Sequence, residues 1–206
     1  FQDDYFLAID KPAGLVVDKA ETNNDTTLED ILVSDLPRKG PPATHALASR
    51  AGIVHRLDKD TSGVILVAKT RKALENLQVQ FKDRIIKKEY IALVHGNVSE
   101  PGIVEGNIGR NPGNREKFTV LEAGKEAVTE YEPVQRLQVT GDRLQEIFED
   151  FSKIQMRKLE KQHYGEFTLL RCKPLTGRTH QIRVHLKYIN HPIICDEKYV
   201  GRKMFR

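Results

Sequence analysis

The sequence contains no tryptophan, and its six tyrosines and eight phenylalanines make up only 7% of 206 residues. Proteins that bind single-stranded nucleic acid on an open face stack its bases on aromatic side chains, so this composition argues against such a platform. Two cysteines, Cys172 and Cys195, are too few for a disulfide framework, and their spacing matches no zinc motif. We therefore expect a reducing, cytoplasmic location.

Long apolar runs are also missing. No stretch approaches the roughly 18 apolar residues that a membrane-spanning helix needs, and no basic segment followed by an apolar one opens the chain as a signal peptide would. We expect no membrane partner. The length is sufficient for one domain that buries its own core.

The net charge of +4 and the pI near 9.0 are modest, but the basic residues are clustered. One cluster lies at residues 69–88 and another lies near the end of the chain: Lys69, Arg71, Lys72, Lys82, Arg84, Lys87 and Lys88, then Arg171, Lys173, Arg178, Arg183 and Lys187. Clustered bases favour a polyanionic partner such as RNA, because binding releases condensed counterions. The alternative for each base is a solvated helix face.

The stretch 53–69, IVHRLDKDTSGVILVAK, places an acidic turn between two apolar runs. Loops held between strands often carry functional side chains, because the strands fix them while solvent still reaches them. Asp58 and the residues after it match the start of a calcium-binding EF-hand loop, but the twelfth position is Lys69 where that loop needs a glutamate. Calcium binding is excluded, and a plain turn remains the alternative.

Five segments, in order along the chain, carry a wider pattern. They are DKPAGL at 10–15, HRLDKDTSG at 55–63, KEYIALVHG at 88–96, GKEAVTEY at 124–131 and PLTGRTHQIRVHL at 174–186. Together they resemble the motifs of the RluA-type RNA pseudouridine synthases. The resemblance implies an α+β fold, in which a bent, mixed and mainly antiparallel sheet is flanked by helices around a central cleft.

Periodicity agrees with a mixed arrangement of strands and helices. The unbroken apolar run 64–68 predicts a buried strand, and Thr70 is placed to cap a helix that follows it. Alternation over 89–94 predicts a strand with Tyr90, Ala92 and Val94 on one face. A last helix, capped by Thr176, is expected near the end of the chain.

We expect a single catalytic domain over residues 1–206. Apolar residues recur at helical spacing between Leu144 and Leu159, which predicts a helical insertion at 142–162 outside all five motifs. The chain begins with Phe1, which suggests an excised domain. The segment before Tyr5 leaves no room for the small N-terminal RNA-binding domain that many of these enzymes carry.

The resemblance also implies three catalytic residues. Converting uridine to pseudouridine breaks the bond between sugar and base and rejoins the base through carbon, and this requires an ionised carboxylate close to the sugar. Asp58 matches the catalytic aspartate. Arg183 matches the arginine that keeps this carboxylate ionised. Tyr90 matches the tyrosine that stacks on the uracil.

Five further residues are expected to contact the RNA. Arg56 matches the arginine that fills the space left when the target base is flipped out of its stack, and Ile182 is expected to line the pocket with apolar surface. His55 is either a structural residue or a phosphate contact. Lys11 and Arg178 are expected to be basic residues that face the RNA.

We expect no metal and no cofactor. Histidines 55, 180 and 185 lack companion ligands at usable spacing, so structural or RNA-contacting roles are favoured over zinc. The expected partner of this monomeric chain is ribosomal RNA first and transfer RNA second. The alternative function is a non-catalytic RNA-binding module of the same fold that acts in ribosome assembly.

Overall fold

The computed structural model describes residues 1–19, 25–35, 50–139, 152–154, 157 and 165–200. Contacts between residues divide the chain into two compact units, Phe1–Ile86 and Lys87–Arg206, and each is described by itself. A single catalytic domain therefore stays a prediction. The predicted insertion at 142–162 lies outside the described residues, apart from 152–154 and 157.

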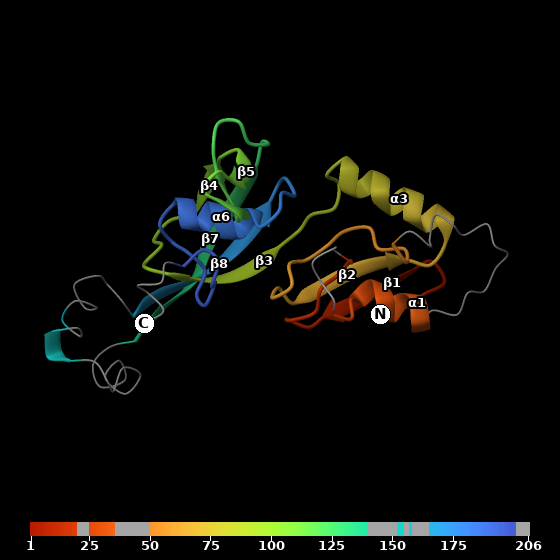
Figure 1. Ribbon diagram of the computed structural model, residues 1–206, viewed down its shortest axis with the longest axis horizontal. Coiled ribbons are helices and arrows are strands. Elements are labelled where there is room, and N and C mark those ends of the chain that lie inside the picture. The colour runs from red at the N-terminus through yellow and green to blue at the C-terminus, as the bar shows by residue number, and fades with distance from the viewer. Residues whose placement is uncertain (20–24, 36–49, 140–151, 155–156, 158–164, 201–206) are drawn as a thin grey trace. The chain divides into compact units, whose positions relative to one another are not determined.

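The first unit is built on two antiparallel strands, β1 (Phe6–Lys11) and β2 (Gly63–Ala68) (Figure 1). The described part of this unit contains helices α1 (Leu28–Asp35) and α3 (Arg71–Lys82), and α3 contacts β2. The apolar side chains between these elements form the core of the unit: Val17, Leu28, Leu32, Ile53, Leu57, Ile65, Val67, Ala68 and Leu74. The loop that carries Asp58 leads directly into β2.

Both helices of the first unit begin with side-chain caps. The Thr70 hydroxyl accepts the Ala73 N–H at 3.2 Å, so the predicted cap of α3 is confirmed. In α1, Thr27 Oγ1 accepts the Asp30 N–H and Asp30 Oδ2 accepts the Thr27 N–H, which is a reciprocal capping box. These caps satisfy backbone donors that a helix start leaves without partners.

The second unit contains a four-stranded sheet in the order β3-β8-β7-β4. The strands are β3 (Tyr90–His95), β4 (Gly102–Glu105), β7 (Val128–Gln138) and β8 (Glu166–Pro174), and a separate hairpin pairs β5 (Ile108–Asn111) with β6 (Asn114–Val120). Every strand pairing in the described part of the chain is antiparallel. The α+β class and the antiparallel pairing are confirmed.

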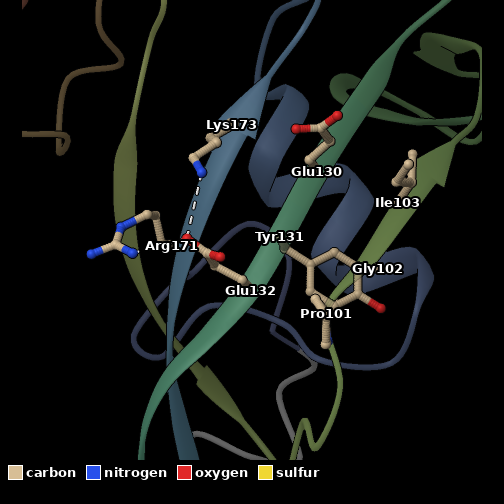
Figure 2. A pocket seen from close by; sticks show the side chains of 8 residues that line it. All are labelled: Pro101, Gly102, Ile103, Glu130, Tyr131, Glu132, Arg171 and Lys173. Carbon is tan, nitrogen blue, oxygen red and sulfur yellow. Dashed lines mark hydrogen bonds and ion pairs between the residues drawn. The ribbon is translucent and has the colours of Figure 1, made fainter.

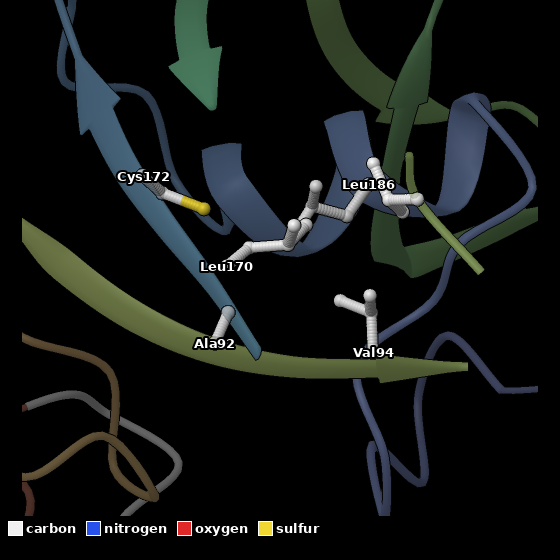
Figure 3. Packing of buried hydrophobic residues seen from close by; sticks show 6 residues of the cluster. Ala92, Val94, Leu170, Cys172 and Leu186 are labelled. Atoms are coloured by element: carbon white, nitrogen blue, oxygen red, sulfur yellow. The ribbon is translucent and has the colours of Figure 1, made fainter. Parts of the chain in front are cut away.

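Helix α6 (Gln181–Tyr188) packs on one face of this sheet. Burial alternates along β8, so every second side chain points toward α6. The core that results comprises Ala92, Val94, Val98, Leu170, Cys172 and Leu186, most of which Figure 3 shows between β3, β8 and α6. Burial raises the pKa of the Cys172 thiol to about 12, so this cysteine is a packing residue and not a nucleophile. Across the described ranges, no helix is long and apolar enough to cross a membrane.

Candidate active site

The loop that carries Asp58 is anchored on both sides of that residue. Leu57 is buried in the core of the first unit. The Thr61 N–H donates to the Asp58 carbonyl at 3.1 Å, which closes a turn. Gly63 then starts β2 with φ +125°, a value that favours glycine. A buried residue, a turn and a glycine thus hold the half-exposed Asp58 in the loop that leads into β2.

Lys11 anchors this loop through hydrogen bonds. Its ammonium donates to the carbonyl oxygens of Pro12 at 2.8 Å, Leu15 at 2.8 Å and Lys59 at 3.0 Å. The Lys59 carbonyl also accepts the Gly14 N–H at 2.9 Å. An ammonium has three donors, and all three are used here. The segment that follows β1 is therefore tied to the residue directly after Asp58.

The expectation that Lys11 faces RNA is wrong. Its side chain is 0% exposed, and its charge is directed at backbone carbonyls of its own unit. Burial lowers the pKa of Lys11, while the negative charges of Asp60 and Asp58 act in the opposite direction. Lys11 therefore supports the loop and places a positive charge close to its carboxylates.

His55 has a structural role. Its Nε2 accepts the Leu66 backbone N–H at 2.9 Å, and its ring stacks on Phe81 with centroids 4.7 Å apart. These contacts join the motif to β2 and α3. They support the structural alternative for His55 over a contact with phosphate.

Arg56 shares an acidic partner with a second arginine that sequence reasoning missed. Its Nη1 lies 3.1 Å from Asp18 Oδ1, and Arg50 Nη2 lies 2.8 Å from Asp18 Oδ2. Both guanidinium groups are exposed, whereas the Asp18 side chain is only 17% exposed. Two cations on one carboxylate leave a net positive charge beside the Asp58 loop.

In the second unit, the amide of Gln181 builds the turn that leads into α6. Its oxygen accepts from the Thr176 hydroxyl at 2.7 Å and the Arg178 N–H at 3.0 Å. Its nitrogen donates to the Val128 carbonyl and to Thr129 Oγ1, both at 2.9 Å. Thr176 was expected to cap the helix, but its hydroxyl serves Gln181 and β7, and His180 stands at the cap position.

His185 extends the same network. Its Nε2 lies 3.0 Å from the Gly106 carbonyl, which can only accept, so Nε2 carries the proton. Its Nδ1 then accepts from the Thr129 hydroxyl at 3.0 Å. Burial lowers the pKa of His185, and the bond to Gly106 opposes this shift only in part. The neutral ring has a structural role, and in the described ranges no three His, Cys, Asp or Glu side chains gather as metal ligands would.

Tyr90 lies on β3, Ile182 and Arg183 lie on α6, and Arg178 lies in the turn before α6. Tyr90 and Ile182 are partly buried and pack against the same apolar cluster. Arg178 Nε donates to the Glu126 carbonyl at 2.9 Å, just before β7. The structure therefore places Tyr90 and Ile182 against one cluster, and a bond to a backbone carbonyl restrains Arg178.

Arg183 makes a bidentate ion pair with Asp196. Nε lies 2.7 Å from Oδ2 and Nη2 lies 2.8 Å from Oδ1, and the two side chains are 19% and 4% exposed. Burial alone raises the pKa of Asp196. The hydrogen bonds and charge of Arg183, with the N–H groups of Tyr199 and Lys198, outweigh that effect, so the pKa is lowered overall. Asp196 was not among the predicted residues, because no local pattern links it to Arg183.

A hollow of about 450 Å³ lies on the second unit, and its lining contains none of the predicted catalytic or RNA-binding site residues (Figure 2). Its charged lining residues come from the facing strands β7 and β8, and Arg171 Nη1 lies 2.8 Å from Glu132. The hydrogen bond from Arg171 and the charge of Lys173 lower the pKa of Glu132. These cross-strand pairs stabilise the sheet and leave no excess positive charge for RNA.

Comparisons with known proteins agree with this geometry. Residues 5–188 match the family model described as RNA pseudouridylate synthase. The chain therefore belongs to the RNA pseudouridylate synthase family, as its five motifs indicated.

Two relatives show how similar the chain is to other members. Ribosomal large subunit pseudouridine synthase D of Nitrosomonas europaea is 41% identical over 199 residues, which cover 97% of this chain and 48% of that protein. An uncharacterized RNA pseudouridine synthase of Bacillus subtilis is 36% identical over 207 residues, which cover 98% of this chain and 57% of that protein. The chain spans about half the length of the curated relatives it matches.

Solved structures support the fold. Human RNA pseudouridylate synthase domain containing 1 superposes with a TM-score of 0.69 at 23% identity, over 99% of this chain and 69% of that one. The human domain containing 4 protein superposes with a TM-score of 0.61 at 24% identity, over 98% and 68%. The predicted pseudouridine synthase fold is confirmed.

Replacing Lys11 with methionine should destabilise the first unit. The substitution removes three hydrogen bonds from a buried side chain to backbone carbonyls and adds none, so we expect a loss of about 2 kcal/mol in the free energy of unfolding. Urea denaturation followed by circular dichroism measures it. Lys72→Met, on the exposed face of α3, is the control and should change little. Equal stability of both variants and the parent would contradict the anchoring role.

The Asp196 pair should make stability depend on pH. The pKa of Asp196 is lower in the folded chain than its ordinary value of 3.8. Its contribution is therefore complete above pH 3.8 and is lost as the pH falls further. At neutral pH, Asp196→Asn should lower the free energy of unfolding by about 2 kcal/mol. The difference from the parent should shrink below pH 3.8. The exposed Glu75→Gln serves as control, and a difference that stays constant in acid would contradict the assignment.

Proposed function

We propose that this chain is the catalytic part of an RNA pseudouridine synthase that isomerises uridines in ribosomal RNA. The observation that carries the proposal is its membership of the family over residues 5–188, with Asp58 intact on an anchored loop. The names of the relatives favour large-subunit ribosomal RNA as the substrate, with transfer RNA as the second candidate. We also propose that the protein acts in the cytoplasm as a monomer.

The reaction needs rearrangement but no oxidation. The bond between C1′ of the ribose and N1 of the uracil breaks, and the base rotates. A bond then forms between C1′ and C5, while C5 loses its hydrogen to water and N1 gains a proton. Atoms and electrons balance without a cofactor. A carboxylate next to the sugar can promote the first step by attack on C1′ or by removal of the C2′ proton.

We assign this carboxylate to Asp58. Its loop is fixed by Leu57 and by the bonds of Lys11 to Lys59, which meets the requirement that a catalytic group be held in place before substrate binds. In the proposal, Arg183 stabilises the ionised carboxylate. Tyr90, whose ring is packed against the apolar cluster of its unit, stacks on the uracil.

Binding of the RNA is assigned to cations that the structure leaves exposed. Arg56 and Arg50 both pair with the Asp18 carboxylate, and the three groups together carry a net positive charge. This charge favours binding of an RNA backbone that is distorted when a base is flipped out. Arg178 is the candidate from the second unit, and Ile182 supplies apolar surface to the pocket. A non-catalytic RNA-binding module that acts in ribosome assembly is the alternative function.

Asp58→Asn should abolish the reaction. The amide keeps the shape of the side chain but removes its charge, so it neither attacks C1′ nor accepts a proton. We expect release of tritium from C5-labelled uridine in ribosomal transcripts to fall by at least about 10³-fold. Asp4→Asn, an exposed aspartate of the same unit, is the matched control and should release tritium at the parent rate.

The same assay separates the two candidate functions. If the parent binds the transcripts but releases no tritium from any of them, the RNA-binding module is the correct function. Release at equal rates by the parent and Asp58→Asn would reject Asp58 as the catalytic carboxylate.

Arg56→Ala should weaken RNA binding in a salt-dependent way. Loss of one phosphate contact lowers the slope of log affinity against log salt by about one. Fluorescence anisotropy with a labelled transcript at several salt concentrations measures both quantities. Arg136→Ala, which removes an exposed guanidinium bonded to the Ser99 carbonyl, is the control. An unchanged slope in Arg56→Ala would remove this residue from the RNA interface.

A further inference from the structure

Arg183 is held by two side chains. The Asp196 carboxylate binds two nitrogens along one edge of the guanidinium, at 2.7 and 2.8 Å. The central carbon of the guanidinium also lies over the Tyr199 ring, 5.0 Å from the ring centroid. The paired hydrogen bonds orient the edge of the guanidinium, and the ring restrains the cation through a second, independent contact.

The two supporting residues are themselves fixed. Asp196 Oδ1 accepts the backbone N–H groups of Lys198 at 3.1 Å and Tyr199 at 3.2 Å, which forms a tight turn. The Tyr199 hydroxyl accepts the Phe118 N–H at 3.0 Å and lies 2.8 Å from His180 Nδ1. Tyr199 is 3% exposed. The turn is thus attached to β6 and to the residue that precedes α6.

We propose that Asp196 and Tyr199 are positioning residues for Arg183, an inference that rests on the proposed function. They contact no reacting atom in this assignment. They hold the guanidinium in one orientation before RNA binds, so that it need not reorganise when charge develops during the reaction. An arginine on a short helix would otherwise sample many rotamers.

Asp196→Asn tests this proposal selectively. The amide oxygen can keep the bonds from the N–H groups of the turn, whereas the amide nitrogen then faces Arg183 Nε, donor against donor. We expect the single-turnover rate of tritium release to fall about 10- to 100-fold, with the RNA dissociation constant unchanged. Glu197→Gln, the exposed carboxylate next to Asp196, is the matched control and should react at the parent rate.

A comparison in a second variant separates a positioning role of Asp196 from a general effect on stability. If Asp196 acts through Arg183, then adding Asp196→Asn to Arg183→Lys should change the remaining rate by less than about twofold. Loss of the same factor in both backgrounds would overturn the proposal, and so would an unchanged rate in Asp196→Asn alone. All rates are measured well below the melting temperature of each variant.

A spectroscopic measurement keeps the inference independent of activity. The Nε–H resonance of Arg183, identified by its absence in Arg183→Lys, should exchange with water at least about tenfold faster in Asp196→Asn than in the parent. Unchanged exchange would overturn the positioning role. A parent that releases no tritium but shows this difference would reject the proposed function and retain the positioning of Arg183.

Discussion

The loop that carries Asp58 depends on one buried ammonium group. Burying a charge costs several kcal/mol unless hydrogen bonds replace its water shell, and Lys11 recovers that cost only while the carbonyls of Pro12, Leu15 and Lys59 surround it. A shift of the loop would leave both the cation and the carbonyls without partners. The burial of Lys11 therefore makes one loop conformation much more stable than its alternatives, and the position of the aspartate follows from it.

In the second unit, an ion pair compensates the cost of burying charged side chains. Arg183 is the candidate catalytic cation, and it meets Asp196 in a geometry that satisfies two donors at once. Neutral side chains also hold α6 in place, because Gln181 and His185 each form a hydrogen bond with Thr129 on β7. In both units a functional side chain is held by contacts to residues that take no part in the proposed chemistry.

Local sequence patterns predicted the strands and caps that depend on residues close together in the chain. The apolar run before Ala68 and the cap at Thr70 correctly predicted β2 and the start of α3, and alternation grouped Tyr90 with the side chains that are buried on one face of β3. The roles of the catalytic residues came from the resemblance and remain proposals. The error at Lys11 had a physical cause. A lysine at the end of a strand is usually solvated, and no local pattern foretells the contact with Lys59, 48 residues later, that accompanies the burial of this one. Asp196 was missed for a similar reason, since ion pairs between a helix and a later turn leave no periodic signal.

The turn that begins at Asp196 also limits where the chain can be cut without loss of contacts to Arg183. The family match ends at residue 188, directly after the last helix. A fragment cut at that boundary would contain all five motifs and yet lack the carboxylate that pairs with Arg183 and the hydroxyl that bonds to the β5–β6 hairpin. The five motifs therefore mark a shorter segment than the one whose contacts hold Arg183, which extends at least to Tyr199.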